Sequence, residues 1–301
     1  MKFSAWPGSA TKWEDLLDLC QHVEQTGWDG LWIADHFMPN RPDSNIGPTQ
    51  EAMTLLAGLA AVVPRLRLGT LVLGNTYRNP AVLAKQAAQV DIISGGRLVF
   101  GLGAGWQENE HEAYGLEFST VGGRMRRLEE AVEIIQSLFR NEQTNFDGRY
   151  YQMKNAPLDP KPVQRPNPPI LIGGGGEKVT LRITAQYADE WNTWGGPEVL
   201  KHKIGVLNEH CAKLGRDPSE ILHSAQALVV LSDDKEVVEA ARGPGRAAIA
   251  GNADEVKQVM QEYVDAGVDE FIMPDFNLGR AVAQRKEAYD RFMAEIVPEF
   301  R

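Results

Sequence analysis

Short apolar runs alternate along the chain with longer segments in which apolar residues recur at helical spacing. In residues 13–26, for example, Leu16, Leu19 and Val23 share one helical face. Runs of the first kind predict strands at residues 2–6, 30–34, 66–73, 98–101, 169–172, 188–192, 225–231 and 270–273. Segments of the second kind predict helices at residues 13–26, 49–62, 80–93, 121–140, 178–187, 198–214, 253–266 and 277–296.

Predicted strands that alternate with helices over 301 residues are typical of an α/β fold, the (β/α)8 TIM barrel. A doubly wound parallel sheet is the alternative. Because neither a second compositional regime nor a long flexible linker interrupts the chain, we expect a single domain over residues 1–301. The proline-rich residues 141–168 form an insertion between strands 4 and 5, which serves either as a lid over the barrel mouth or as an ordered belt.

Glycine residues follow the fourth predicted strand at alternate positions. Gly101, Gly103 and Gly105 remove side chains from one face of the strand end, so that something flat or bulky can approach the backbone. The alternative is a barrel strand that uses small residues for packing. A dinucleotide-binding fingerprint is disfavoured, because it requires glycine where Trp106 stands.

The second predicted strand runs into Asp35 and His36. Histidine exchanges a proton near neutral pH, so at the carboxyl end of a barrel strand it predicts a proton relay. The alternative is a histidine that only forms a hydrogen bond at a strand end.

Four consecutive glycines, residues 173–176, follow the fifth predicted strand. Their backbone N–H groups, at the start of a helix, predict a phosphate site. Lys178 and Arg182, just inside that helix, would add positive charge. A flexible turn is the alternative, but four glycines would cost much backbone entropy for a mere turn.

Residues 108–112 look at first like a metal-binding motif. Gly115 stands where the second histidine of an HExxH motif would be, so the segment predicts an exposed, negatively charged helix start. Arg124, Arg126 and Arg127 are predicted to lie on a solvated helix face. The alternative is that these arginines reach a polyanionic tail at the rim.

The predicted strand ends combine aromatic, amide and glycine residues with one prominent histidine. The set comprises Trp6, Asp35, His36, Gly74, Asn75, Trp106, Gln107, Glu108, Asn109, Gly173, Gly174, Gly175, Gly176, Asn192, Thr193, Trp194, Gln226 and Asp275. Because it lacks a cluster of carboxylates and histidines, it favours a flat aromatic cofactor over a metal ion.

Composition and charge exclude several classes of protein. The formal net charge of −10 makes the chain a poor candidate for binding nucleic acid or anionic membranes. Cys20 and Cys211 indicate neither a metal site nor a disulfide framework. Neither a signal peptide nor a membrane-spanning run is evident, so we expect a cytoplasmic protein that acts on a small molecule.

Together these motifs resemble the luciferase-like monooxygenase superfamily, and within it the coenzyme F420-dependent oxidoreductases. The resemblance extends over nearly the whole chain. The most specific motifs are Arg78-Asn79-Pro80, Ser94-Gly95-Gly96-Arg97 and Gly103-Ala104-Gly105-Trp106, supported by Ala34-Asp35-His36-Phe37 and Pro169-Ile170-Leu171-Ile172.

The resemblance implies a role for each strand end. Asp35 and His36 would border the reacting ring as catalytic residues. A bulge with a cis peptide, expected between Leu71 and Val72, would support the ring from behind. The other coenzyme-binding residues would be Gly74, Gly103, Ala104, Gly105 and Asn109, with Gly173, Gly174, Gly175 and Gly176 around the phosphate.

Cofactor chemistry separates the functional hypotheses that the resemblance implies. With coenzyme F420 the protein would be a hydride-transferring dehydrogenase or reductase, and with FMN it would be an oxygen-using monooxygenase. An inert coenzyme-binding barrel is a third hypothesis, against which the polar Asp35, His36 and Asn75 argue. The family's sugar-phosphate dehydrogenases carry a catalytic glutamate where this chain has Trp106, which disfavours a sugar phosphate. The substrate stays open, and a homodimer is expected.

Overall fold

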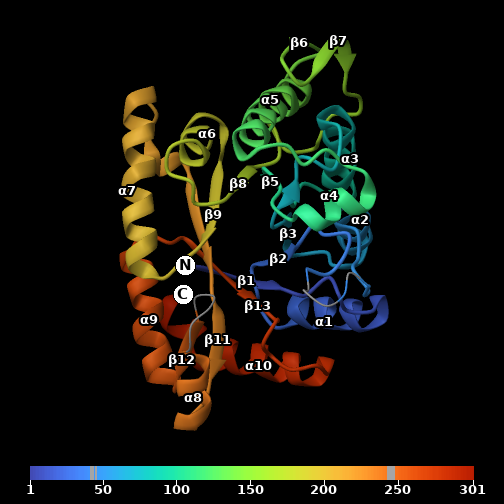
Figure 1. Ribbon diagram of the computed structural model, residues 1–301. Coiled ribbons are helices and arrows are strands. Elements are labelled where there is room, and N and C mark those ends of the chain that lie inside the picture. The colour runs from blue at the N-terminus through green and yellow to red at the C-terminus, as the bar shows by residue number, and fades with distance from the viewer. Residues whose placement is uncertain (41–43, 45, 243–247) are drawn as a thin grey trace. The chain divides into compact units, whose positions relative to one another are not determined.

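Strands and helices alternate along the chain in the order that the hydrophobic pattern predicts (Figure 1). The computed structural model describes residues 1–40, 44, 46–242 and 248–301. The chain divides into two compact units. The first consists of Met1–Gly8, Lys12–Trp32 and Gly174–Arg301, and the second of Ser9–Thr11 and Ile33–Gly173.

The first unit contains parallel strands in the order β2-β1-β13-β10-β9 and a separate parallel pair, β11 and β12. These strands are β1 (Lys2–Trp6), β2 (Gly30–Ile33, the last residue of which falls in the second unit), β9 (Glu190–Trp194), β10 (Leu222–Gln226), β11 (Leu228–Leu231), β12 (Ala248–Gly251) and β13 (Glu270–Pro274). The helices are α1 (Trp13–Gln25), α6 (Thr180–Tyr187), α7 (Pro197–Leu214), α8 (Lys235–Ala241), α9 (Ala253–Asp265) and α10 (Val282–Glu295). Helices α7 and α9 lie side by side (Figure 1).

The second unit is built around β5 (Leu98–Gly103), which pairs in parallel with β3 (Arg67–Thr70), β4 (Leu73–Gly74) and β8 (Ile170–Gly173). Its helices are α2 (Ala52–Val62), α3 (Pro80–Ser94), α4 (Glu108–Tyr114) and α5 (Val121–Arg140). Strands β6 (Gln143–Asp147) and β7 (Gln152–Pro157) form an antiparallel hairpin.

The main sheet follows the order β3-β2-β1-β13-β10-β9-β8-β5-β4, and β3 also pairs with β5. Strands β3 and β4 are two parts of one barrel strand, interrupted at Leu71 and Val72. Parallel strands that alternate with helices in this order form the (β/α)8 barrel that the sequence predicted. The single domain over residues 1–301 stays a prediction.

Large aromatic side chains fill the core of the first unit. The Phe292 ring of α10 lies 5.8 Å from the Phe3 ring of β1 and is stacked 5.9 Å from the Trp28 ring. Tyr289, one turn earlier on α10, meets Trp28 edge to face at 5.0 Å. Since aromatic side chains bury about 150–250 Å² each, these contacts fix β1 against α10.

Several predicted boundaries are wrong; the last helix, for example, was predicted to begin at residue 277 but begins at Val282. The seventh barrel strand is β10 (Leu222–Gln226), whereas the predicted strand at residues 225–231 merges its end with β11, which pairs with β12 instead. Only Ala227 separates the two strands and it is buried, so the apolar run shows no break. The predicted helix at residues 178–187 begins later, at Thr180.

Candidate active site

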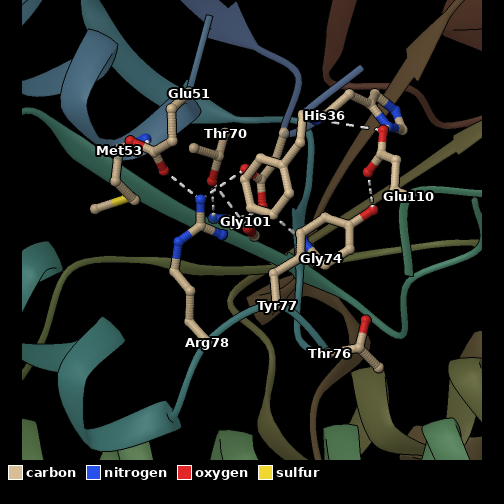
Figure 2. Close-up of polar contacts among 12 residues, drawn as sticks. His36, Glu51, Met53, Thr70, Gly74, Thr76, Tyr77, Arg78, Gly101 and Glu110 are labelled. Carbon is tan, nitrogen blue, oxygen red and sulfur yellow. Dashed lines mark hydrogen bonds and ion pairs between the residues drawn. The ribbon is translucent and has the colours of Figure 1, made fainter. Parts of the chain in front are cut away.

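His36 is held by a buried carboxylate within the second unit. Its Nδ1 lies 2.9 Å from Oε1 of Glu110, which is fully buried on α4. The same oxygen accepts the backbone N–H of Phe37 at 3.3 Å, and Oε2 accepts the hydroxyl of Tyr77. Figure 2 shows Glu110 between His36 and Tyr77. Three donors therefore compensate the burial of this carboxylate.

The carboxylate fixes the tautomer of the imidazole. An ionised carboxylate only accepts hydrogen bonds, so Nδ1 of His36 carries the proton and Nε2 is the acceptor in the neutral ring. Among the described residues, Nε2 has no hydrogen-bond partner, and the side chain is 27% exposed. Burial, followed by the hydrogen bond and charge of Glu110, raises the pKa of Tyr77, so the phenol keeps its proton and donates. This arrangement leaves Nε2 of His36 free to exchange a proton with a bound molecule.

Asp35 does not contact His36 through its carboxylate. It forms a two-pronged ion pair with Arg78, at 2.7 Å to Nη1 and 2.8 Å to Nη2, and accepts the backbone N–H of Gly74 at 3.0 Å. Arg78 also pairs with Glu51, which caps the N-terminus of α2 (Figure 2). Asp35 therefore connects the end of β2 to β4. Its predicted role beside the coenzyme ring stays a prediction.

Replacing Asp35 is expected to destabilise the protein. Asp35→Ala leaves Arg78 with Glu51 alone and leaves the N–H of Gly74 without its carboxylate, which should lower the melting temperature by about 5–10 °C. Asp233→Ala, at an exposed position, is the matched control and should change the melting temperature by less than about 2 °C. Equal melting temperatures for the two variants in a thermal scan would contradict this expectation.

The peptide bond between Leu71 and Val72 is cis, as predicted. It lies where β3 ends and β4 has not yet begun. The N–H of Leu71 donates to the carbonyl of Ile33 at 2.8 Å, and Thr70 exchanges hydrogen bonds with the backbone of Gly101 at 2.9 and 3.2 Å. Hydrogen bonds from Thr70 and Leu71 thus connect the backbone at the interruption to the neighbouring barrel strands.

The alternate glycines make room for Val72. A Cβ atom at Gly103 would lie 2.7 Å from Cγ2 of Val72, and one at Gly173 would lie 2.8 Å from Cγ1. At Gly101 a Cβ would lie 1.9 Å from the carbonyl oxygen of Thr70. The bulky group that approaches these glycines is therefore a side chain of the protein itself. Val72 is partly exposed and therefore presents an apolar surface, which we call the apolar floor. Behind it lies the backbone of these glycines, which carry no side chains.

The loop after β5 is held in place by α4 and α5. Gly105 has a φ of +77°, which disfavours any other residue, and its carbonyl accepts Nε of Arg124 at 3.2 Å. Arg124 is buried and its guanidinium stacks 3.8 Å from the ring centre of Phe118, so the prediction of a solvated Arg124 is wrong. Ala104 is partly exposed beside it.

The prediction of an exposed, acidic helix start at residues 108–112 is correct for Glu108 and Glu112, which are exposed at the start and end of the segment, but wrong for Glu110 and His111. Glu110 and His111 are fully buried on α4, while Asn109 is partly exposed. His111 uses both ring nitrogens, at 2.8 Å from the carbonyl of Gln107 and 2.7 Å from Oγ1 of Thr76. Glu110 and His111 can be buried because both side chains have hydrogen-bond partners in the interior.

Trp106 stands beside His36. The two rings are 5.4 Å apart and nearly perpendicular, and the Trp106 side chain is 58% exposed. The exposed indole next to the unpaired imidazole nitrogen offers an apolar surface to a molecule bound at His36.

The four-glycine loop has a defined conformation. Gly174 has a φ of +118°, and its N–H donates to the carbonyl of Asn192 at 2.9 Å. Its own carbonyl accepts the indole N–H of Trp191 at 2.9 Å, and the carbonyl of Gly175 accepts Nζ of Lys203 at 2.7 Å. The cation bound to this loop is thus Lys203 of α7, which no local sequence pattern indicates because it lies 28 residues along the chain from Gly175. Lys178, which was predicted from the sequence, is exposed.

Two kinds of site find no support among the residues that the structure describes. Within residues 1–40, 44, 46–242 and 248–301, no group of three histidine, cysteine or acidic side chains is placed to hold a metal ion. In the same part of the chain, none of the helices has the length and apolar character needed to cross a bilayer.

Fold and site together define a (β/α)8-barrel protein with a carboxylate-held histidine at a strand end. The chain belongs to the luciferase-like monooxygenase family, whose model matches residues 1–270. It is 29% identical to an F420-dependent glucose-6-phosphate dehydrogenase of Kineococcus radiotolerans, over 95% of this chain and 93% of that protein.

A second relative with the same name, from Amycolatopsis mediterranei, is 33% identical over 58% of this chain, but the match spans only half (50%) of that relative. Among solved structures, an F420-dependent secondary alcohol dehydrogenase in complex with an F420–acetone adduct superposes with a TM-score of 0.84. The superposition covers 100% of both chains at 22% sequence identity, which supports the fold.

Proposed function

We propose that the protein is a coenzyme F420-dependent oxidoreductase that transfers hydride between the deazaflavin and a small organic substrate. The observation that carries the proposal is His36, whose Nδ1 is held by a buried carboxylate and whose Nε2 has no partner among the described residues. The relatives named as F420-dependent dehydrogenases support the choice of coenzyme.

The residues present fit a flat coenzyme ring. Val72 offers a partly exposed apolar surface, and Gly103 and Gly173 behind it have no space for a side chain. Gly74, Leu71 and Val72 would support the ring, and Gly103, Ala104, Gly105 and Asn109 would line its edge. Gly173, Gly174, Gly175 and Gly176 would hold the phosphate.

When bound, coenzyme F420 supplies hydride transfer to or from a carbon atom of the substrate. The protein provides the group that accepts or donates the accompanying proton. Nε2 of His36 accepts the proton that an alcohol releases on oxidation, or donates one when a carbonyl is reduced. Glu110 keeps the ring oriented, and Tyr77 and the N–H of Phe37 keep Glu110 in place. Asp35 positions the strand end from which His36 projects.

The substrate is proposed to be a small molecule other than a sugar phosphate, although the relatives' names give glucose 6-phosphate. Trp106 occupies the place of the glutamate expected in sugar-phosphate dehydrogenases and presents an apolar ring beside His36. A homodimer is proposed as well, and light scattering coupled to gel filtration tests it.

The protein is expected to bind coenzyme F420 more tightly than FMN. Tryptophan fluorescence titrations with each compound measure both dissociation constants under the same conditions. Tighter binding of FMN, together with oxygen consumption in the presence of reduced FMN, would place the protein among the monooxygenases. Binding of neither compound would favour an inert barrel.

A further inference from the structure

The backbone on both sides of Trp106 is fixed within the second unit. The carbonyl of Gly105, immediately before it, accepts Nε of Arg124 at 3.2 Å. The side-chain amide of Gln107, immediately after it, donates to the carbonyl of Met38 at 3.2 Å and is buried. The main chain therefore presents the Trp106 side chain from a defined place.

The indole of Trp106 is exposed and has no hydrogen-bond partner among the described residues. A single exposed apolar side chain is common on protein surfaces and is not by itself a sign of a binding site. What distinguishes this one is its neighbour: the indole lies 5.4 Å from the imidazole of His36, measured between ring centres. That imidazole has its Nδ1 held by Glu110 and its Nε2 unpaired among the described residues.

The distance between the two rings defines what the indole can touch. A substrate that exchanges a proton with Nε2 of His36 places its oxygen about 2.6–3.2 Å from that nitrogen. The reacting carbon is one covalent bond further out. Because the ring centres of His36 and Trp106 are 5.4 Å apart, a substituent of a few atoms on that carbon can contact the indole. Trp106 therefore faces the part of the substrate next to the reacting atom.

The charges of the surrounding network favour an uncharged substituent. Glu110 is a buried carboxylate in direct contact with His36. The guanidinium of Arg78 is engaged by both Asp35 and Glu51, and this side chain is only 11% exposed. An anionic group beside His36 would therefore meet the carboxylate of Glu110 and an arginine that is already paired, whereas an apolar group would meet the indole face.

We propose that Trp106 determines substrate specificity by binding the apolar substituent on the carbon that reacts. This inference rests on the proposed function, for which it names the substrate class: uncharged ketones that carry an apolar chain on the carbonyl carbon, and the corresponding alcohols. In the reduction direction the carbonyl carbon gains a hydride, with its two electrons, from reduced F420. The carbonyl oxygen gains a proton from Nε2 of protonated His36, which takes one back from solvent.

The kinetic test supplies methyl ketones of increasing length, from acetone to 2-hexanone, to the enzyme loaded with reduced F420. We expect kcat/KM to rise about two- to fourfold for each added methylene group, because each one buries apolar surface against the indole. Trp106→Ala should abolish most of this rise, and Trp106→Phe should keep part of it. A general loss of coenzyme binding would lower all the values by the same factor and leave their ratios unchanged.

Leu214→Ala is the matched control for the kinetic test. It truncates an exposed apolar side chain at the end of α7 and should leave the dependence on chain length as it is in the unmodified protein. Circular dichroism should show that all three variants are folded, since both Trp106 and Leu214 are exposed.

Direct binding separates failure of this inference from failure of the proposed function. Fluorine NMR of the protein without coenzyme, labelled with fluorotryptophan, reports on each indole, and Trp106→Phe identifies the resonance of Trp106. Added 2-hexanone should shift this resonance and leave that of the fully buried Trp28 in place. Glucose 6-phosphate should shift neither.

Two results would overturn the inference and leave F420 dependence intact. One is a Trp106 resonance that 2-hexanone does not move, and the other is a dependence of kcat/KM on chain length that Trp106→Ala leaves unchanged. Absence of F420 binding would overturn the proposed function, while the NMR result would still test whether Trp106 binds an apolar chain.

Discussion

His36→Ala is expected to lower turnover about 10²- to 10⁴-fold and to leave the dissociation constant of F420 nearly unchanged. The variant removes the nitrogen that exchanges a proton with the substrate, whereas the apolar floor at Val72 and the glycine loops stay as they are. Steady-state kinetics and a fluorescence titration on the same preparation measure the two effects. Added imidazole should restore part of the lost activity if a missing proton carrier is the cause.

Glu110→Gln provides the companion measurement. The amide oxygen can still accept the Nδ1 proton of His36, but it lacks the charge that fixes which nitrogen carries that proton. We expect a smaller loss of kcat than in His36→Ala, an unchanged KM for the substrate, and no rescue by imidazole. A His36→Ala variant that turns over at a near-normal rate would leave this histidine only a structural role.

The sequence predicted the barrel because its strands and helices differ in period and composition over many residues. His36 was predicted from its place at the end of a strand, whereas the cis bond after Leu71 was predicted from the family resemblance. The run at residues 225–231 was misplaced because the buried Ala227 hides the break between two strands. The period of the hydrophobic pattern predicts helices and strands well, but it predicts the boundary between two adjacent apolar strands poorly.

Glu110 and Lys203 were missed for a different reason. Glu110 sits among acidic neighbours, a pattern typical of solvent exposure, and its partners His36 and Tyr77 lie 74 and 33 residues away. Lys203 reaches the carbonyl of Gly175 from 28 residues further along the chain. Only the folded barrel brings these groups together, so no local pattern could reveal either pairing.

Gly174→Val is expected to abolish coenzyme binding, with the dissociation constant rising on the order of 100-fold or more. The carbonyls of Gly174 and Gly175 are held by Trp191 and Lys203. In a trans peptide the N–H points opposite to the carbonyl, so the N–H groups of Gly175 and Gly176 point away from those two partners. Neither N–H has a partner among the described residues, which makes them the proposed phosphate donors.

A valine cannot easily adopt the φ of +118° found at Gly174, so the substitution would turn these peptides and misdirect both donors. Gly215→Val is the matched control, because Gly215 also has a positive φ, of +67°, and open space around its Cβ position at the end of α7. Circular dichroism should show both variants folded, and only Gly174→Val should lose F420 in a binding titration. A folded Gly174→Val protein that binds F420 with unchanged affinity would mean that the phosphate is held by other residues.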